Sequence, residues 1–197
     1  MEKRSRRPLV LATLLFFAPL IGAFLLYYGG FWRPAASTHH GDLISPARPL
    51  PSIALSDPDG NLLPSDFVQH RWSLVYVGDG NCDMRCRAAL ADMRRARELL
   101  GRDSVRVQSV FLVNADCCDR VVLRVADASL LIARIDAARA APLVALFPAY
   151  ADLPVAAAGR IYVVDPLGNL MMSYAPDAPS TGMYDDLKKL LNLSHIG

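Results

Sequence analysis

The sequence has little of what most enzyme active sites use. Among its 197 residues are four histidines and four cysteines, and no histidine occurs from residue 71 to residue 194. No nucleophile with a partner base, phosphate-binding glycine loop or paired carboxylates stands out. The net charge is +2, of which residues 1–7, with four basic residues and one acidic, contribute +3, leaving −1 for the remainder. The chain therefore has no basic face for nucleic acid.

Charge is also absent from Pro8 to Trp32, a run of 25 residues. As a helix rising about 1.5 Å per residue, this run is long enough to cross a bilayer. The basic segment 1–7 predicts that the N-terminus lies in the cytoplasm and that the rest lies beyond the membrane. A cleaved signal peptide is the alternative, although its apolar region usually has about 7–15 residues. We expect a single-pass anchor over 8–32 in the inner (cytoplasmic) membrane, with the following domain in the periplasm or an equivalent outer compartment.

A linker is predicted over 33–51, which contains four prolines and the pair His39 and His40. This composition is typical of a semi-extended connection rather than of a core. Adjacent residues of an extended chain point to opposite sides, so we interpret the two histidines as solvated residues rather than metal ligands. The folded domain is expected over 52–197.

Predicted strands and helices alternate along this domain. After a turn at 57–60, strands are predicted over 72–77, 104–113, 160–164 and 170–174, and helices over 83–100, 127–140 and 184–193. Asp127 is the predicted cap of the middle helix and Pro142 its stop. A strand–helix–strand unit places its two strands parallel. The order predicts a thioredoxin-like α/β sandwich preceded by one transmembrane helix.

Cys82 and Cys86 lie where the first of these helices begins, directly after the apolar strand at 72–77. The positive end of a helix dipole favours thiolate over thiol, and Arg85 and Arg87 act in the same direction. Side chains four residues apart on a helix face the same side, so the sulfurs can form a disulfide or hold one metal ion. We predict Cys82 as the more exposed, attacking thiol and Cys86 as the resolving thiol. The alternative is a pair of inert, buried cysteines.

A second cysteine pair, Cys117 and Cys118, follows the strand that ends at Val113. Because neighbouring parallel strands end at one edge of an open α/β sheet, all four thiols can converge there. The second pair could exchange with the first, complete a thiolate metal site, or contribute to a static disulfide. Met84 could offer a thioether to Cu(I), although packing is the commoner role of methionine. His70, before the first strand, is predicted at the surface.

The segments around the first cysteine pair resemble the Sco (SenC) family of cytochrome c oxidase assembly proteins. The similarity runs from about Leu50 to Leu191 and is clearest over 72–86 (WSLVYVGDGNCDMRC) and 161–168 (IYVVDPLG). The resemblance implies a thioredoxin-like fold and a cysteine pair that holds copper together with a distant histidine. It also implies that copper is delivered to the binuclear copper site of an oxidase subunit, or that the cysteines of that site are reduced.

The sequence departs from this family in its expected ligands. Ala157 stands where the family has its histidine, and Asp83 and Arg87 stand where a proline usually follows each cysteine. No proline directly precedes the strand at 160–164, where ordinary thioredoxins carry a cis-proline; Pro154 lies too far upstream. The resemblance therefore supports a thiol site more than a copper site.

We predict a membrane-anchored, Sco-like thiol protein that assists oxidase assembly by exchange at Cys82 and Cys86. These two thiolates could also hold Cu(I), helped by Cys117 or Cys118, and the absence of a histidine ligand favours Cu(I) over Cu(II). The expected partners are a respiratory oxidase subunit or its assembly factors. Two alternatives remain: a non-catalytic assembly scaffold with a structural Cys82–Cys86 bridge, and a general thiol–disulfide oxidoreductase.

Overall fold

The computed structural model describes residues 7–29, 39–114, 127–194 and 196, which form two compact units divided after Thr38. The first unit contains helix α1 (Arg7–Tyr28). Its segment Val10–Tyr28 is apolar and long enough to cross a membrane, with a mean hydropathy of 2.3 and no buried residue. By length and composition alone, a signal sequence near the N-terminus would look the same.

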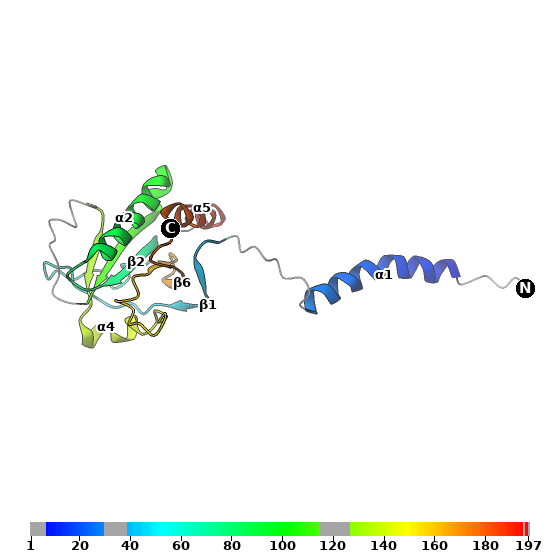
Figure 1. Cartoon of the computed structure of the whole chain (residues 1–197), viewed down its shortest axis with the longest axis horizontal. Helices are drawn as coiled ribbons and strands as arrows, with labels where there is room; N and C mark the ends of the chain where they lie inside the picture. The colour runs from blue at the N-terminus through cyan, green and yellow to red at the C-terminus, as the bar shows by residue number, and fades with distance from the viewer. Residues whose placement is uncertain (1–6, 30–38, 115–126, 195, 197) are drawn as a thin grey trace, which may run out of the picture. The chain divides into compact units, whose positions relative to one another are not determined.

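The second unit is built on one mixed sheet of six strands in the order β1-β6-β5-β2-β3-β4 (Figure 1). The strands are β1 (Asp42–Pro49), β2 (Trp72–Gly78), β3 (Val107–Val113), β4 (Leu131–Arg134), β5 (Ile161–Val164) and β6 (Asn169–Tyr174). Strands β2, β3 and β4 are parallel, whereas β5 and β1 run antiparallel to their neighbours. The helices are α2 (Met84–Leu99), α4 (Ala137–Val144) and α5 (Ser180–Leu193), with a 3₁₀ helix, η1 (Gly101–Arg106).

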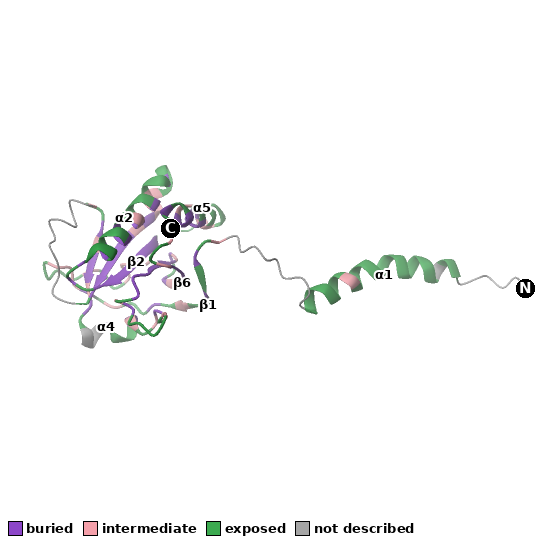
Figure 2. Ribbon diagram, in the orientation of Figure 1, coloured by how far each residue is buried: buried purple, intermediate pink, exposed green. Residues whose placement is uncertain are grey.

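Strand β2 lies at the centre because both of its faces are apolar, and all seven of its residues are buried (Figure 2). Successive side chains of a strand point to opposite faces. Leu74 and Tyr76 join the core under α2 and α5, whereas Val75 and Val77 join the core on the α4 side. The resulting layers, with helices on both faces, confirm the predicted thioredoxin-like α/β sandwich.

Most predicted elements are present, but the helix predicted over 127–140 is wrong. Within that range the structure has strand β4, in which Leu131 pairs with Val110 of β3. Asp127 accepts a hydrogen bond from the backbone N–H of Ser129 at 2.9 Å, so it closes a turn and caps no helix there. A short apolar run is compatible with strand or helix, and the free edge of β3 provides a partner for a strand. Helix α4 begins later and contains Pro142.

Part of the predicted linker is also a strand. Residues 42–49 form β1, which pairs antiparallel with β6, with Asp42 opposite Ser173. Pro46 and Pro49 indicated a linker because proline has no backbone N–H to donate to a neighbouring strand. Strand β1 lies at the edge of the sheet, where the backbone groups on one side have no neighbouring strand, so proline is tolerated there. The sheet therefore begins ten residues earlier than the sequence pattern indicates.

The first residues of the domain are held by Asp186 of α5, whose side chain is 2 % exposed. Its Oδ2 accepts hydrogen bonds from the backbone N–H groups of His40 (2.7 Å) and Gly41 (3.2 Å) and from the Tyr174 hydroxyl (3.2 Å). The ring of His40 also contacts Oδ1 at 3.3 Å, so this histidine, interpreted above as solvated, takes part in the contact. Burial, and then the charge of Asp186, raise the pKa of Tyr174, which keeps the phenol protonated as a donor.

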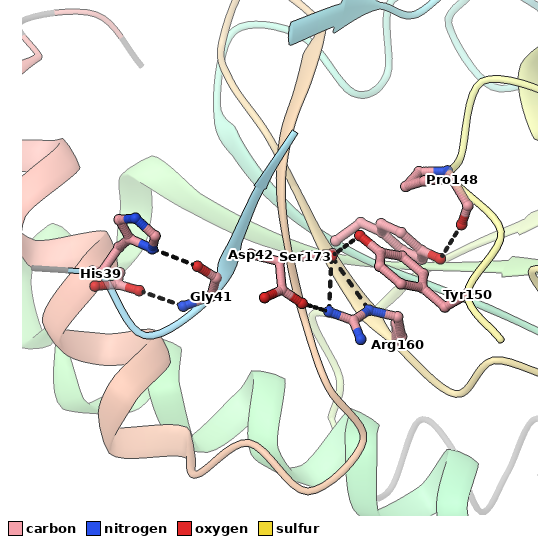
Figure 3. A network of polar contacts seen from close by, with 9 residues as sticks. His39, Gly41, Asp42, Pro148, Tyr150, Arg160 and Ser173 are labelled. Atoms are coloured by element: carbon pink, nitrogen blue, oxygen red, sulfur yellow. Dashed lines mark hydrogen bonds and ion pairs between the residues drawn. The ribbon is translucent and has the colours of Figure 1, made fainter. Parts of the chain in front are cut away.

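A second polar cluster joins β1 to the strands beside it (Figure 3). The buried guanidinium of Arg160 contacts the carboxylate of Asp42 and donates from Nη2 to the Ser173 hydroxyl at 3.1 Å. It also lies 3.7 Å from the ring centroid of Tyr150, whose hydroxyl is 2.7 Å from the same serine oxygen. A buried cation is tolerated when such partners compensate its lost hydration.

We expect Asp186→Ala in the full chain to lower the free energy of unfolding of this domain by roughly 2–4 kcal/mol, because it leaves buried donors without an acceptor. Asp185→Ala provides a matched control, since this neighbouring carboxylate is exposed, and it should change stability by no more than about 0.5 kcal/mol. Urea unfolding followed by circular dichroism measures both. Equal effects of the two substitutions would contradict a specific role for Asp186.

Candidate thiol site

The site is built at the junction between β2 and α2. Strand β2 ends at Gly78, and a turn follows in which the Asn81 N–H donates to the Asp79 carboxylate at 3.1 Å. Asp83 is the N-cap of α2, and its Oδ1 accepts a hydrogen bond from the backbone N–H of Cys86 at 3.0 Å. A capping carboxylate satisfies an N–H group that has no partner within the helix. Strand end, turn and cap together fix where the two cysteines stand.

Cys82 and Cys86 form a disulfide in the structure, with 5.0 Å between their Cα atoms. Both are buried: Cys82 is 4 % exposed and Cys86 is 3 % exposed, and both belong to the core under α2. Neither sulfur is exposed in this disulfide, so the assignment of Cys82 as the more exposed, attacking thiol stays a prediction. Cys82 stands before the helix, where a backbone φ of +35° lets the chain turn and its sulfur bond to that of Cys86 within the core.

Two aromatic rings lie behind this corner. A Cβ at Gly78 would lie 2.9 Å from the Tyr76 ring and 3.1 Å from the Phe111 ring, so the absence of a side chain allows both rings to pack there. Burial, followed by the charges of Asp83 and Asp79, raises the pKa of Tyr76, against an opposing effect of Arg85. The Tyr76 phenol is therefore neutral and lies within the electrostatic field of the turn.

Charges of both signs surround the disulfide. Arg87 donates from Nε to the backbone carbonyl of Cys82 at 3.1 Å, and Arg85 is exposed in the same turn. The carboxylates of Asp79 and Asp83 place negative charge at the same corner and oppose the effect of these cations. Because a negative charge at the helix start offsets the dipole there, the field favours thiolate less than the arginines alone would suggest. Met84 is 87 % exposed, so it does not fill the packing role expected of a methionine.

The sequence indicates that Asp83 and Arg87 replace the family's prolines and that Arg87 adds a positive charge near the cysteines, but it does not predict the contacts of either residue. Asp83 could have been recognised as an N-cap, since Asp before a helical apolar pattern is a known start signal. The bond from Arg87 to the Cys82 carbonyl has no such signal, because it depends on the turn conformation at Cys82.

Cys117 and Cys118 lie outside the described residues. What the structure does describe is the end of the strand before them: Val113 lies beside Gly78 in parallel register, and Asn114 N–H donates to the Gly78 carbonyl at 3.1 Å. The chain that leads to the second pair therefore leaves the sheet beside the disulfide corner. Convergence of all four thiols stays a prediction.

The remaining histidine positions offer no ligand in the described part of the chain. His70 precedes β2, and its exposed ring lies 3.0 Å from the Asp66 carboxylate, which confirms its predicted surface position. Ala157 lies exposed in the segment before β5. Within residues 7–29, 39–114, 127–194 and 196, no group of three or more His, Cys, Asp or Glu side chains could hold a metal ion.

Solved structures with this architecture include Sco proteins and thiol:disulfide interchange proteins. Apo Sco1 from Thermus thermophilus is 21 % identical and covers 79 % of this chain and 99 % of its own, with a TM-score of 0.61. Copper-bound yeast Sco1 is 16 % identical, covering 77 % and 96 %, with a TM-score of 0.60. A thioredoxin-family thiol:disulfide interchange protein from Chlorobium tepidum is 14 % identical, covering 75 % and 99 %, with a TM-score of 0.55. These likenesses show a shared fold.

Curated protein sequences give no match to the chain. A family model, described as the transmembrane-like, thioredoxin-like, C-terminal domain, matches residues 72–194. The match covers more than half of the chain and runs from the start of β2, through the disulfide corner, to the end of α5. The chain therefore belongs to the transmembrane-like, thioredoxin-like, C-terminal domain family.

Proposed function

We propose that the chain is a membrane-anchored thiol–disulfide protein that assists assembly of a respiratory oxidase through Cys82 and Cys86. The observation that carries this proposal is a disulfide at the junction of β2 and α2 in a thioredoxin-like sheet. The fold shared with Sco1 and with thiol:disulfide interchange proteins supports exchange chemistry at that junction. The resemblance of residues 72–86 to the Sco family supports the assignment to oxidase assembly.

The exchange consumes one disulfide and one dithiol. A thiolate of the partner attacks one sulfur of the pair, the Cys82–Cys86 bond breaks, and the other cysteine leaves as a thiolate with the electron pair. The partner's second thiolate then attacks the mixed disulfide, so that the partner is oxidised and this chain is reduced; the reverse sequence reduces the partner. Cys82 is the sulfur we assign to the mixed disulfide, because it stands outside the helix and can move without unwinding α2.

Copper, in this proposal, is cargo. The reduced pair offers two soft thiolates one helical turn apart, a donor set that suits Cu(I) better than Cu(II). Cys117 or Cys118 would be the additional donors. Without a third ligand in the described residues, we place thiol exchange first and Cu(I) transfer second.

The start of the domain and the disulfide lie at the same end of the sheet. Gly41 lies against Tyr174, and Tyr174, Ile161 and Tyr76 are successive partners across β6, β5 and β2. Gly78, where β2 ends, follows Tyr76 by two residues. The apolar N-terminal helix supports a partner in the same membrane. The basic N-terminal segment supports placing the domain outside the cytoplasm.

Asp83→Asn should make the disulfide more oxidising, because it removes a negative charge that opposes thiolate formation while an amide oxygen keeps the cap. We expect the reduction potential to rise by on the order of 10 mV, which corresponds to about 0.5 kcal/mol. Equilibration with glutathione redox buffers measures the potential. Asp103→Asn, an exposed change in η1, is the charge-matched control; a potential that falls in Asp83→Asn would contradict the electrostatic argument.

Cysteine trapping in the native membrane tests the function itself. Cys86→Ser should accumulate a mixed disulfide through Cys82 because the resolving thiol is absent, and mass spectrometry should identify an oxidase subunit or an assembly factor. Cys82→Ser should trap much less. If neither variant traps a partner, and the double serine variant loses stability but supports normal oxidase maturation, the pair is a structural bridge in a scaffold. Trapping of many unrelated proteins would instead indicate a general oxidoreductase.

Cu(I) binding is tested separately by titrating the reduced chain against a chromogenic Cu(I) chelator. We expect one Cu(I) per chain in the reduced form, none in the oxidised form and no stable Cu(II) complex, because the donors are thiolates. Substituting Cys82 and Cys86 by serine should abolish uptake. Undiminished uptake by that variant would place the copper elsewhere in the chain.

A further inference from the structure

The disulfide is closed to a protein thiol in the structure. Exchange requires the attacking thiolate to reach one of the two sulfurs. Cys82 and Cys86 are 4 % and 3 % exposed and packed in the core under α2. For exchange with another protein, the chain around the disulfide must therefore open first and expose one of the two sulfurs.

The backbone at Cys82 indicates where the site opens. Its φ of +35° lies in the left-handed region, which is costly for a residue with a side chain. Such a conformation persists only where the surroundings hold it. Cys82 also belongs to the turn before α2, so it can change conformation without breaking a hydrogen bond within the helix. Cys86, by contrast, lies in the first turn of α2, with its N–H bonded to the cap of that helix.

One side chain holds the Cys82 backbone. Arg87 donates from Nε to the Cys82 carbonyl at 3.1 Å. Within the part of the chain that the structure describes, this is the one hydrogen bond made to the main chain of Cys82. Arg87 is itself placed by α2, since its backbone N–H donates to the Asp83 carbonyl at 3.0 Å. The guanidinium thus ties the strained turn to the rigid helix.

We propose that Arg87 is a positioning residue that latches Cys82 and controls access to the disulfide. While Arg87 holds the Cys82 carbonyl, the sulfurs stay in the core; when the bond opens, the turn relaxes and presents the Cys82 sulfur to a partner's thiolate. That thiolate attacks the Cys82 sulfur, and Cys86 leaves as a thiolate with the electron pair. The partner's second thiolate then releases Cys82, so a protein dithiol is oxidised and this disulfide is reduced. The inference rests on the exchange function proposed above.

Rates of reduction by thiols of different size test the latch. The oxidised full chain in detergent is reduced with dithiothreitol, a small dithiol, and with reduced thioredoxin, a protein dithiol. We expect Arg87→Met to raise the thioredoxin rate relative to the dithiothreitol rate by about fivefold, the factor expected for the loss of one hydrogen bond. Hydrogen exchange of the backbone amides of residues 79–83 should accelerate in the same variant.

Two further variants separate the latch from charge. Arg85→Met removes the same charge from an exposed position in the same turn, and it should leave the ratio of rates unchanged. Arg87→Gln removes the charge but keeps an N–H donor, Nε2, at the same number of bonds from the backbone, so its ratio should stay near the unsubstituted value. A ratio that does not change in Arg87→Met, or that rises as much in Arg87→Gln or Arg85→Met, would overturn the proposal. Failure to trap a membrane partner would instead count against the exchange function, whatever the ratio.

Discussion

Burial of β2 on both faces is the constraint on which the rest of the domain depends. The strand can satisfy its apolar side chains only between two layers, so α2 and α5 cover one face and α4 with the preceding loops covers the other. Its backbone needs partners on both sides, which β3 and β5 provide. The position of Gly78, where β2 ends, then fixes the turn, the cap at Asp83 and the disulfide. The thiol site is thus a consequence of how the central strand is buried.

The polar contacts of strand β1 differ from those of the disulfide corner. Near β1 these contacts are made by two buried side chains. Asp186 accepts hydrogen bonds from the backbone N–H groups of His40 and Gly41. Arg160 contacts the Asp42 carboxylate and donates a hydrogen bond to the Ser173 hydroxyl. At the disulfide corner the polar contacts are few and partly exposed, and a single arginine holds the strained turn. Regions that open readily are those with few buried contacts and exposed hydrogen bonds. Few contacts therefore oppose local opening beside the disulfide, whereas buried contacts oppose it at the start of the domain.

Local patterns predicted the centre of the fold and failed at its edges. The apolar run of β2 and the 3.6-residue spacing of α2 both follow from residues close in sequence. Strand β1 could not be predicted from such a pattern, because its prolines are acceptable only at a sheet edge, and the distant strand β6 sets that position. Strand β4 could not be predicted either, because a run of four residues is too short for its periodicity to distinguish a strand from a helix. In the site, the cysteine pair was evident, whereas the burial of Cys82 depends on a turn conformation that no local pattern encodes.

The chemistry of the corner follows from the balance between burial and charge. A disulfide in the core is protected from adventitious thiols, and the arginines favour the thiolates that appear on reduction, while Asp83 and Asp79 oppose them. A copper site would benefit from a permanent third ligand and a preformed cavity, and the described residues around Cys82 and Cys86 provide two sulfurs that bond to one another instead. An exchange site needs only that bond, a way to expose it and a field that tolerates either redox state. Those three requirements are met by the turn at Cys82, the contact from Arg87 and the opposed charges, which is why thiol exchange comes before copper transfer in the proposed function.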